Sequence, residues 1–302
     1  MIQEKYINPF TDFGFKRLFG EEANKVLLID FLNSFLPQKH QIAELTFRNP
    51  NYTGMIESER NAFFDIFCKA QSGEYFIVEM QKAKHNFFRD RSLFYVSYPI
   101  REEAQKGSNW TFELPNIYFF AILDFKIEEK DEREKVLREV MLKDQDCEVF
   151  YEKLRFVFIQ MPSFKKTLNE LSTHQDKWLY FLKYLPSFEY IPEILKEPVF
   201  EQAFEVANLA ALSQEDYMNY EQSLLKYAEI RGVVETAFGE GEQIGLQKGE
   251  QIGLQKGEQI GLQKGEHKKA LETAQNLKKL GVLNVEQIAQ ATGLSKKEVE
   301  KL

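Results

Sequence analysis

Two acidic residues in neighbouring apolar segments, Asp65 and Glu79, are the residues of this chain best placed to do chemistry. They belong to the segment 61–82, NAFFDIFCKAQSGEYFIVEMQK, which predicts two strands joined by a turn at Gln71-Ser72-Gly73. Side chains alternate across a strand, so Glu79 and Gln81 share one face. If Asp65 points to the same side, two carboxylates and an amide converge there.

Carboxylates on strands this apolar are costly to bury unless a cation or several hydrogen bonds compensate their charge. A divalent metal ion is the simplest compensating group. Oxygen ligands without a histidine or cysteine metal-binding pattern favour Mg²⁺ or Mn²⁺ over zinc. Such an ion activates water and stabilises a phosphoryl transition state, so the pair points to phosphoryl-transfer chemistry. The structural alternative is that the two acids face solvent or form salt bridges.

The spacing from Asp65 to Glu79-Met80-Gln81 resembles the acid and (D/E)-x-K core of the PD-(D/E)XK nuclease superfamily. Gln81 stands where most members carry lysine, and this variant resembles the recombination-promoting nuclease (Rpn) family, also described as PD-(D/E)XK nuclease family transposases. Three further stretches agree with that family: NPFTDFGFKRLFG at 8–20, FRDRSLFYVSYPIREEAQKG at 88–107 and NIYFFAILDF at 116–125.

This resemblance implies an α/β, restriction-endonuclease-like PD-(D/E)XK core, with a mixed central sheet flanked by helices. It also implies a DNA endonuclease that depends on Mg²⁺ or Mn²⁺. Asp65 and Glu79 would be catalytic metal ligands, the carbonyl of Met80 would complete the metal site, and Gln81 would orient water or phosphate. Because glutamine lacks the positive charge of lysine, a non-catalytic nucleic-acid or protein interaction module with the same fold remains the alternative.

Two further pairs of residues are candidates for substrate binding. A helix predicted over 83–106 places Arg91 and Tyr95 four residues apart on one face, suited to hold a phosphate backbone. The alternative is a solvated face over an aromatic core. Asp12 and Lys16 are secondary candidates, because the resemblance places the opening motif near the active site. Their structural alternative is a helix cap and a surface cation.

The remaining elements follow from periodicity and turn residues. Residues 1–235 are expected to form the nuclease-like domain, with a helical extension over 131–235. Apolar runs predict central strands at 117–125 and 156–161. Amphipathic spacing predicts helices at 24–35, 175–185, 192–211 and 213–235.

The C-terminal region has a different character. Residues 236–266 repeat GEQIGLQK with glycine at every fourth position, and each glycine costs a helix about 1 kcal/mol relative to alanine. The repeat therefore predicts a semi-flexible tether. Residues 267–302 have the rhythm of a helix-turn-helix, with Gly293 at the turn and Ser295 as the next helix cap. Both DNA contact and self-association, giving a homo-oligomer, are open for this module.

Composition limits the remaining possibilities. The chain has 302 residues, 43% hydrophobic, and a net charge of −8, so a DNA-binding surface must be local. Two cysteines without a CxxC spacing argue against a disulfide framework or a zinc knuckle. We find no signal peptide and no apolar run of membrane-spanning length, so we expect a cytoplasmic protein with no membrane partner.

Overall fold

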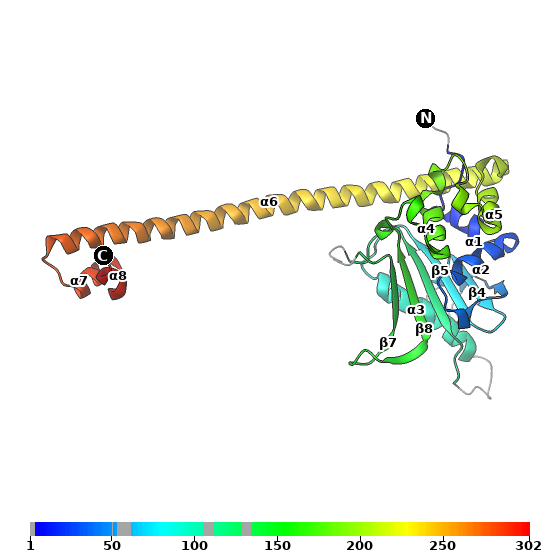
Figure 1. Ribbon diagram of the computed structural model, residues 1–302, viewed down its shortest axis with the longest axis horizontal. Helices are drawn as coiled ribbons and strands as arrows, with labels where there is room; N and C mark the ends of the chain where they lie inside the picture. Colours follow the sequence, from blue (N-terminus) through cyan, green and yellow to red (C-terminus); the bar gives the residue numbers. More distant parts are fainter. Residues whose placement is uncertain (1–3, 50, 53–61, 105–111, 129–133) are drawn as a thin grey trace. The chain divides into compact units, whose positions relative to one another are not determined.

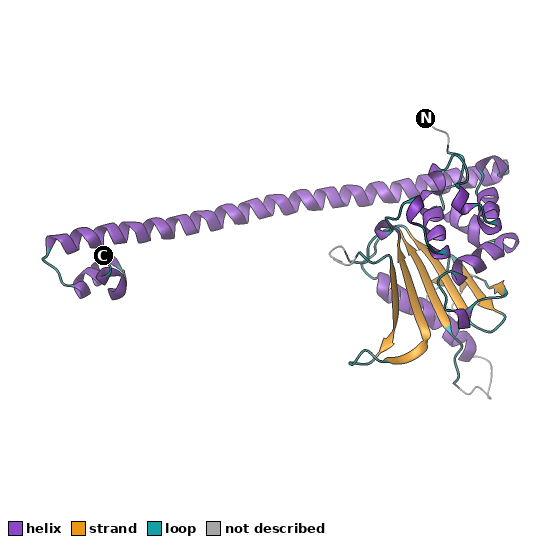
Figure 2. Ribbon diagram, viewed as in Figure 1, coloured by secondary structure: helices purple, strands orange, loops and turns teal. Residues whose placement is uncertain are grey.

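A mixed six-stranded sheet forms the centre of the computed structural model, which describes residues 4–49, 51–52, 62–104, 112–128 and 134–302 (Figures 1 and 2). The strand order is β1-β4-β5-β6-β8-β7; β6 pairs in parallel with β5 and β8, and the other pairs are antiparallel. The strands are β1 (Leu45–Phe47), β4 (Ile66–Ala70), β5 (Tyr75–Gln81), β6 (Ile117–Leu123), β7 (Leu137–Lys143) and β8 (Val149–Gln160). A separate ribbon pairs β2 (Asn51–Tyr52) with β3 (Ala62–Phe63). The predicted α/β architecture is therefore confirmed.

The inner strands β5 and β6 are buried along their whole length because helices cover both faces of the sheet (Figure 2). On one face, Phe76, Val78 and Met80 join a core with helices α1 (Asp12–Phe19), α2 (Lys25–Asn33), α4 (His174–Tyr184) and α5 (Pro198–Val206). On the other face, Tyr75 and Ile77 pack with α3 (Phe88–Ala104). Short 3₁₀ turns occupy Glu22–Asn24, Gln38–His40, Met161–Ser163, Leu168–Glu170, Leu185–Ser187, Glu193–Leu195 and Leu209–Ala211.

Several predicted elements differ from the structure. The expected helical extension over 131–235 instead begins with the β7–β8 hairpin, whose edge strand LREVMLK does not alternate apolar and polar residues and so gives no strand pattern in the sequence. The first of the two strands predicted in segment 61–82 is divided into β3 and β4, so Asp65 lies between strands rather than within one. The helix predicted over 83–106 is α3, which begins only at Phe88, and the last two predicted residues lie outside the described part. The helix predicted over 192–211 is shortened to α5, with a 3₁₀ turn on each side of it.

The repeat is helical, which corrects the prediction of a semi-flexible tether. Helix α6 runs without interruption from Gln214 to Leu280 and includes all of the glycines from Gly239 to Gly265. Glutamate, glutamine, leucine and lysine, which fill most other repeat positions, are strong helix formers, and no proline interrupts them. The isoleucine and leucine side chains of the repeat are exposed, with Leu246 and Leu254 each 74% exposed.

The first turns of α6 belong to the first unit, residues 1–234. The backbone N–H of Asn8 donates to the Tyr220 hydroxyl over 2.9 Å, and that of Phe13 donates to the Ser223 hydroxyl over 3.1 Å. The Tyr227 hydroxyl donates to Asp124 Oδ2 over 2.7 Å. These bonds join α6 to the segment that opens α1 and to the end of β6.

The second unit, residues 235–302, has a small core of its own. Helices α7 (Val285–Thr292) and α8 (Lys296–Glu300) pack on the end of α6 through Ala274, Ile288, Ala289, Leu294 and Val299. Asn284 and Ser295 form capping boxes, and Gly293 takes a φ of +73° at the turn between the helices. The predicted helix-turn-helix pattern, including its glycine and its cap, is present. None of the helices in the described ranges is long and apolar enough to cross a membrane.

Truncated chains test whether the first turns of α6, residues 214–234, stabilise the first unit. A chain ending at residue 234 keeps the three hydrogen bonds to Tyr220, Ser223 and Tyr227 and should unfold at nearly the same temperature as the first unit of the full chain. A chain ending at residue 213 loses two buried tyrosines, worth at least about 3 kcal/mol, and its melting temperature should fall by at least about 6 °C. Differential scanning calorimetry compares them. Equal melting temperatures would mean that α6 does not stabilise the first unit.

Candidate active site

Asp65 and Glu79 meet at one end of the sheet and each accepts a hydrogen bond from the backbone of the other's segment. The antiparallel register pairs Ile66 with Val78, which places Asp65 beside Glu79. The Asp65 N–H donates to Glu79 Oε1 over 3.2 Å, and the Met80 N–H donates to Asp65 Oδ2 over 2.7 Å. These reciprocal bonds fix the position of both carboxylates.

Burial is the main electrostatic feature of this pair. The Glu79 side chain is almost completely buried, and desolvation followed by the negative charge of Asp65 raises its pKa to about 8. Desolvation also raises the pKa of Asp65, opposed by the hydrogen bond from Met80. Two carboxylates that resist ionisation together form a site that a cation would stabilise strongly.

On the α3 side, Gln81 and Arg91 complete the surroundings of Glu79. Gln81 Nε2 donates to Glu79 Oε2 over 2.9 Å, and the Arg91 guanidinium donates to Gln81 Oε1. Arg91 Nη2 also lies 4.0 Å from Glu79 Oε2, and its Cζ lies 5.6 Å from the centre of the Tyr95 ring. Gln81 therefore connects the Arg91 guanidinium to the buried Glu79 carboxylate by hydrogen bonds. Arg91 and Tyr95, four residues apart, lie on the same side of α3.

On the α1 side, Asp12 and Lys82 form an ion pair with Nζ and Oδ1 2.9 Å apart. The charges of Asp12, Lys16 and Lys82 all act on the pKa of Asp65. Asp12 is the first residue of α1 rather than its cap; Thr11 is the cap and accepts from the Gly14 N–H over 3.0 Å. Sequence reasoning assigned no role to Lys82, and only the fold of α1 against the sheet shows its pairing with Asp12.

The donor set fits Mg²⁺ or Mn²⁺ better than a metal that needs a full protein cage. Within the described ranges, no group of three or more His, Cys, Asp and Glu residues could hold a metal ion. Mg²⁺ commonly uses one or two carboxylates and fills its other positions with water and substrate oxygens. Asp65 and Glu79 match that requirement, and Asp65 Oδ1 has no hydrogen bond among those found in the described residues.

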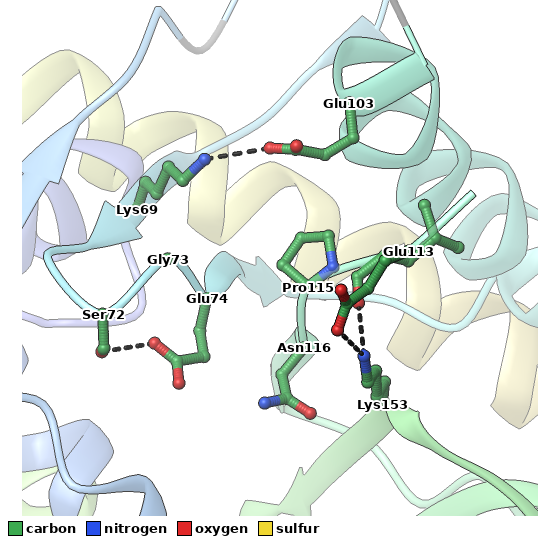
Figure 3. A pocket seen from close by; sticks show the side chains of 10 residues that line it. Lys69, Ser72, Gly73, Glu74, Glu103, Glu113, Pro115, Asn116 and Lys153 are labelled. Carbon is green, nitrogen blue, oxygen red and sulfur yellow. Dashed lines mark hydrogen bonds and ion pairs between the residues drawn. The ribbon is translucent and has the colours of Figure 1, made fainter. Parts of the chain in front are cut away.

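A polar cavity of about 420 Å³ lies at the opposite end of β4 and β5, beside their connecting turn (Figure 3). Its two lysines are already paired: Lys69 Nζ lies 2.9 Å from Glu103 Oε1, and Lys153 Nζ lies 3.2 Å from Glu113 Oε1. The cavity contains neither Asp65 nor Glu79 and is separate from the acid pair.

The family model for PD-(D/E)XK nuclease family transposases matches residues 9–237. The chain belongs to this family. The comparisons with curated proteins and with solved structures found no match. The predicted family is thus confirmed, and membership in this nuclease family supports a nuclease or transposase-like function. The matched residues include the acid pair, α1, α3 and the first turns of α6.

The raised pKa of Glu79 predicts that metal binding depends on pH. In the metal-free protein the folded state favours protonated Glu79, whereas the unfolded chain ionises near its ordinary value of 4.5. Folded-state stability from this group is therefore highest at low pH and falls as pH rises from about 4.5 to about 8. A divalent ion must displace that proton, so its affinity should rise over the same range.

Thermal unfolding with and without Mg²⁺ measures this effect. The increase in melting temperature caused by Mg²⁺ should be larger at pH 8.5 than at pH 6, and Glu79→Gln should abolish most of the increase at both values. An equal Mg²⁺ effect at the two pH values in the unaltered protein would contradict the proposed coupling between proton and metal.

Proposed function

We propose that the protein is a metal-dependent DNA endonuclease that hydrolyses phosphodiester bonds. The observation that carries this proposal is the Asp65–Glu79 pair, in which Glu79 is buried and Asp65 half-buried, with its reciprocal hydrogen bonds, in a chain that belongs to a nuclease family. Asp65 and Glu79 are the proposed ligands of Mg²⁺ or Mn²⁺, with the carbonyl of Met80 as a third. A divalent ion bound there would supply Lewis-acid activation of water and neutralise charge on the phosphate.

The protein's own residues would orient the reacting groups. Gln81 is held between Glu79 and Arg91, so its amide has one defined orientation rather than several. An oriented amide positions water or a phosphate oxygen by hydrogen bonds, while the nearby Arg91 guanidinium supplies the positive charge that glutamine lacks. This division of roles explains how a site with Gln81 in place of lysine retains a cation.

The cations around the pair would bind the DNA backbone. Arg91 approaches from α3, while Lys16 and Lys82 act on Asp65 from the α1 side, so positive charges lie on both sides of the acids. The chain as a whole has a net charge of −8, which repels DNA. DNA binding therefore requires positive charges that are concentrated at one place on the surface. Tyr95 supports Arg91 through its ring. Asp12 would hold Lys82 in position through their ion pair.

The second unit would act by proximity rather than chemistry. Its helix-turn-helix arrangement and the exposed side chains of the repeat helix suit a second contact with DNA or with another copy of the chain. The alternative function for the whole protein is a non-catalytic interaction module. Gln81 at the position of the usual lysine and the net charge of −8 keep that alternative open.

Cleavage of supercoiled plasmid distinguishes the two functions. The unaltered protein should nick or linearise plasmid only with Mg²⁺ or Mn²⁺, and Asp65→Asn and Glu79→Gln should abolish cleavage because they remove the ligand charge while keeping the side-chain shape. Gln81→Ala should lower the rate about ten- to a thousandfold, as expected for loss of an orienting group. Glu74→Gln, at the far end of β5, is the matched control. Equal cleavage by all four variants would remove the assignment.

A further inference from the structure

Exposed phenylalanines lie on the flank of α3 that also carries Arg91. The Arg91 N–H donates to the Phe87 carbonyl over 2.9 Å, so the helical turn already includes Phe87. Phe87, Arg91 and Phe94 are spaced by four and three residues and therefore lie on one flank. The Phe87 and Phe94 side chains are 74% and 42% exposed.

A continuous row of rings connects this flank to the acid pair. The ring centre of Phe94 lies 5.2 Å from that of Tyr98 and 6.4 Å from that of Tyr95. Tyr95 and Tyr98 in turn lie 5.0 and 5.7 Å from Phe64, which directly precedes Asp65. The rings at Phe64, Tyr95 and Tyr98 are at least partly buried, whereas Phe94 is at the surface. The row thus begins at the candidate active site and ends in solvent.

Single exposed apolar side chains are common on protein surfaces and need no partner. This flank differs because a cation lies between two exposed rings. Arg91 is partly exposed, donates to Gln81, and lies between Phe87 and Phe94 along the helix. Nucleobases stack on aromatic rings, and the phosphate between two bases is attracted to a cation. In a duplex the faces of the bases are already stacked on one another, so only an unpaired strand offers both groups together.

We propose that this flank binds unpaired DNA, with bases stacked on Phe94 and Phe87 and the intervening phosphate beside Arg91. The substrate is then single-stranded DNA, or duplex opened at the cleaved position, rather than intact duplex. That this DNA is the substrate rests on the proposed endonuclease function. Binding of the DNA to the flank does not require cleavage.

Binding is therefore measured in EDTA, where no divalent ion is available for cleavage. Fluorescence anisotropy with a labelled single-stranded oligonucleotide and its duplex compares the unaltered protein with Phe87→Leu, Phe94→Leu and the double variant. Leucine keeps an apolar side chain but removes the ring. Phe150→Leu is the matched control, since Phe150 is 80% exposed near the start of β8 and belongs to another element than the proposed binding flank. Melting temperatures establish that each variant folds.

The unaltered protein should bind the single strand more tightly than the duplex. The double variant should lose on the order of ten- to a hundredfold in affinity for the single strand, while Phe150→Leu changes nothing. In a second measurement, DNA should quench the added tryptophan fluorescence of Phe94→Trp but not that of Phe150→Trp. Unchanged single-strand affinity in the double variant, or a preference for duplex in the unaltered protein, would overturn the inference.

Two other outcomes would separate DNA binding at this flank from protein binding and from the endonuclease proposal. If the double variant binds DNA normally but sediments at a different mass, the flank contacts protein and the inference is wrong. If ring-dependent binding is found but plasmid and oligonucleotide are not cleaved in Mg²⁺, the inference holds for binding and only the endonuclease proposal fails.

Discussion

The exchange of hydrogen bonds between Asp65 and Glu79 is the constraint on which the rest of the site depends. Each carboxylate accepts an N–H from the segment that carries the other acid, so neither can move without breaking a bond to the backbone. Hydrogen bonds to charged groups contribute about 1.5–3 kcal/mol each, which offsets only part of the cost of burying two like charges. The pair is therefore positioned before any ligand arrives, and without a metal ion the buried Glu79 keeps its proton up to a pKa of about 8.

The sheet explains why this arrangement is stable despite that cost. Residues on both sides of β5 are buried in the two cores, so the end of the strand has little freedom. Helix α3 brings Arg91 to Gln81 on one side, and α1 brings Asp12 to Lys82 on the other. The first turns of α6 then tie the segment before α1 to the end of β6 through Tyr220 and Tyr227. Core packing supplies the stability, and the polar contacts supply the orientation.

The sequence was most informative where local pattern and tertiary environment agree. The apolar runs around Glu79 and over 117–125 are buried strands, and the acid spacing identified the pair that the fold brings together. The edge strand β7 is not predicted because its residues do not alternate between apolar and polar, as those of a half-buried strand do. The glycines of the repeat predict flexibility, but its glutamate, glutamine, leucine and lysine residues favour the helix that forms. Contacts between distant segments, such as Lys82 with Asp12, have no local signature.

The central claim is that Asp65 and Glu79 hold a divalent ion, and anomalous diffraction from crystals grown with Mn²⁺ tests it most directly. We predict one strong anomalous peak at about 2.0–2.2 Å from a carboxylate oxygen of each residue, which is the distance of hard oxygen ligands in such sites. The peak should be missing in crystals of Glu79→Gln grown in the same solution. A well-ordered pair with no peak between its carboxylates, at saturating Mn²⁺ and pH 8.5, would contradict the account.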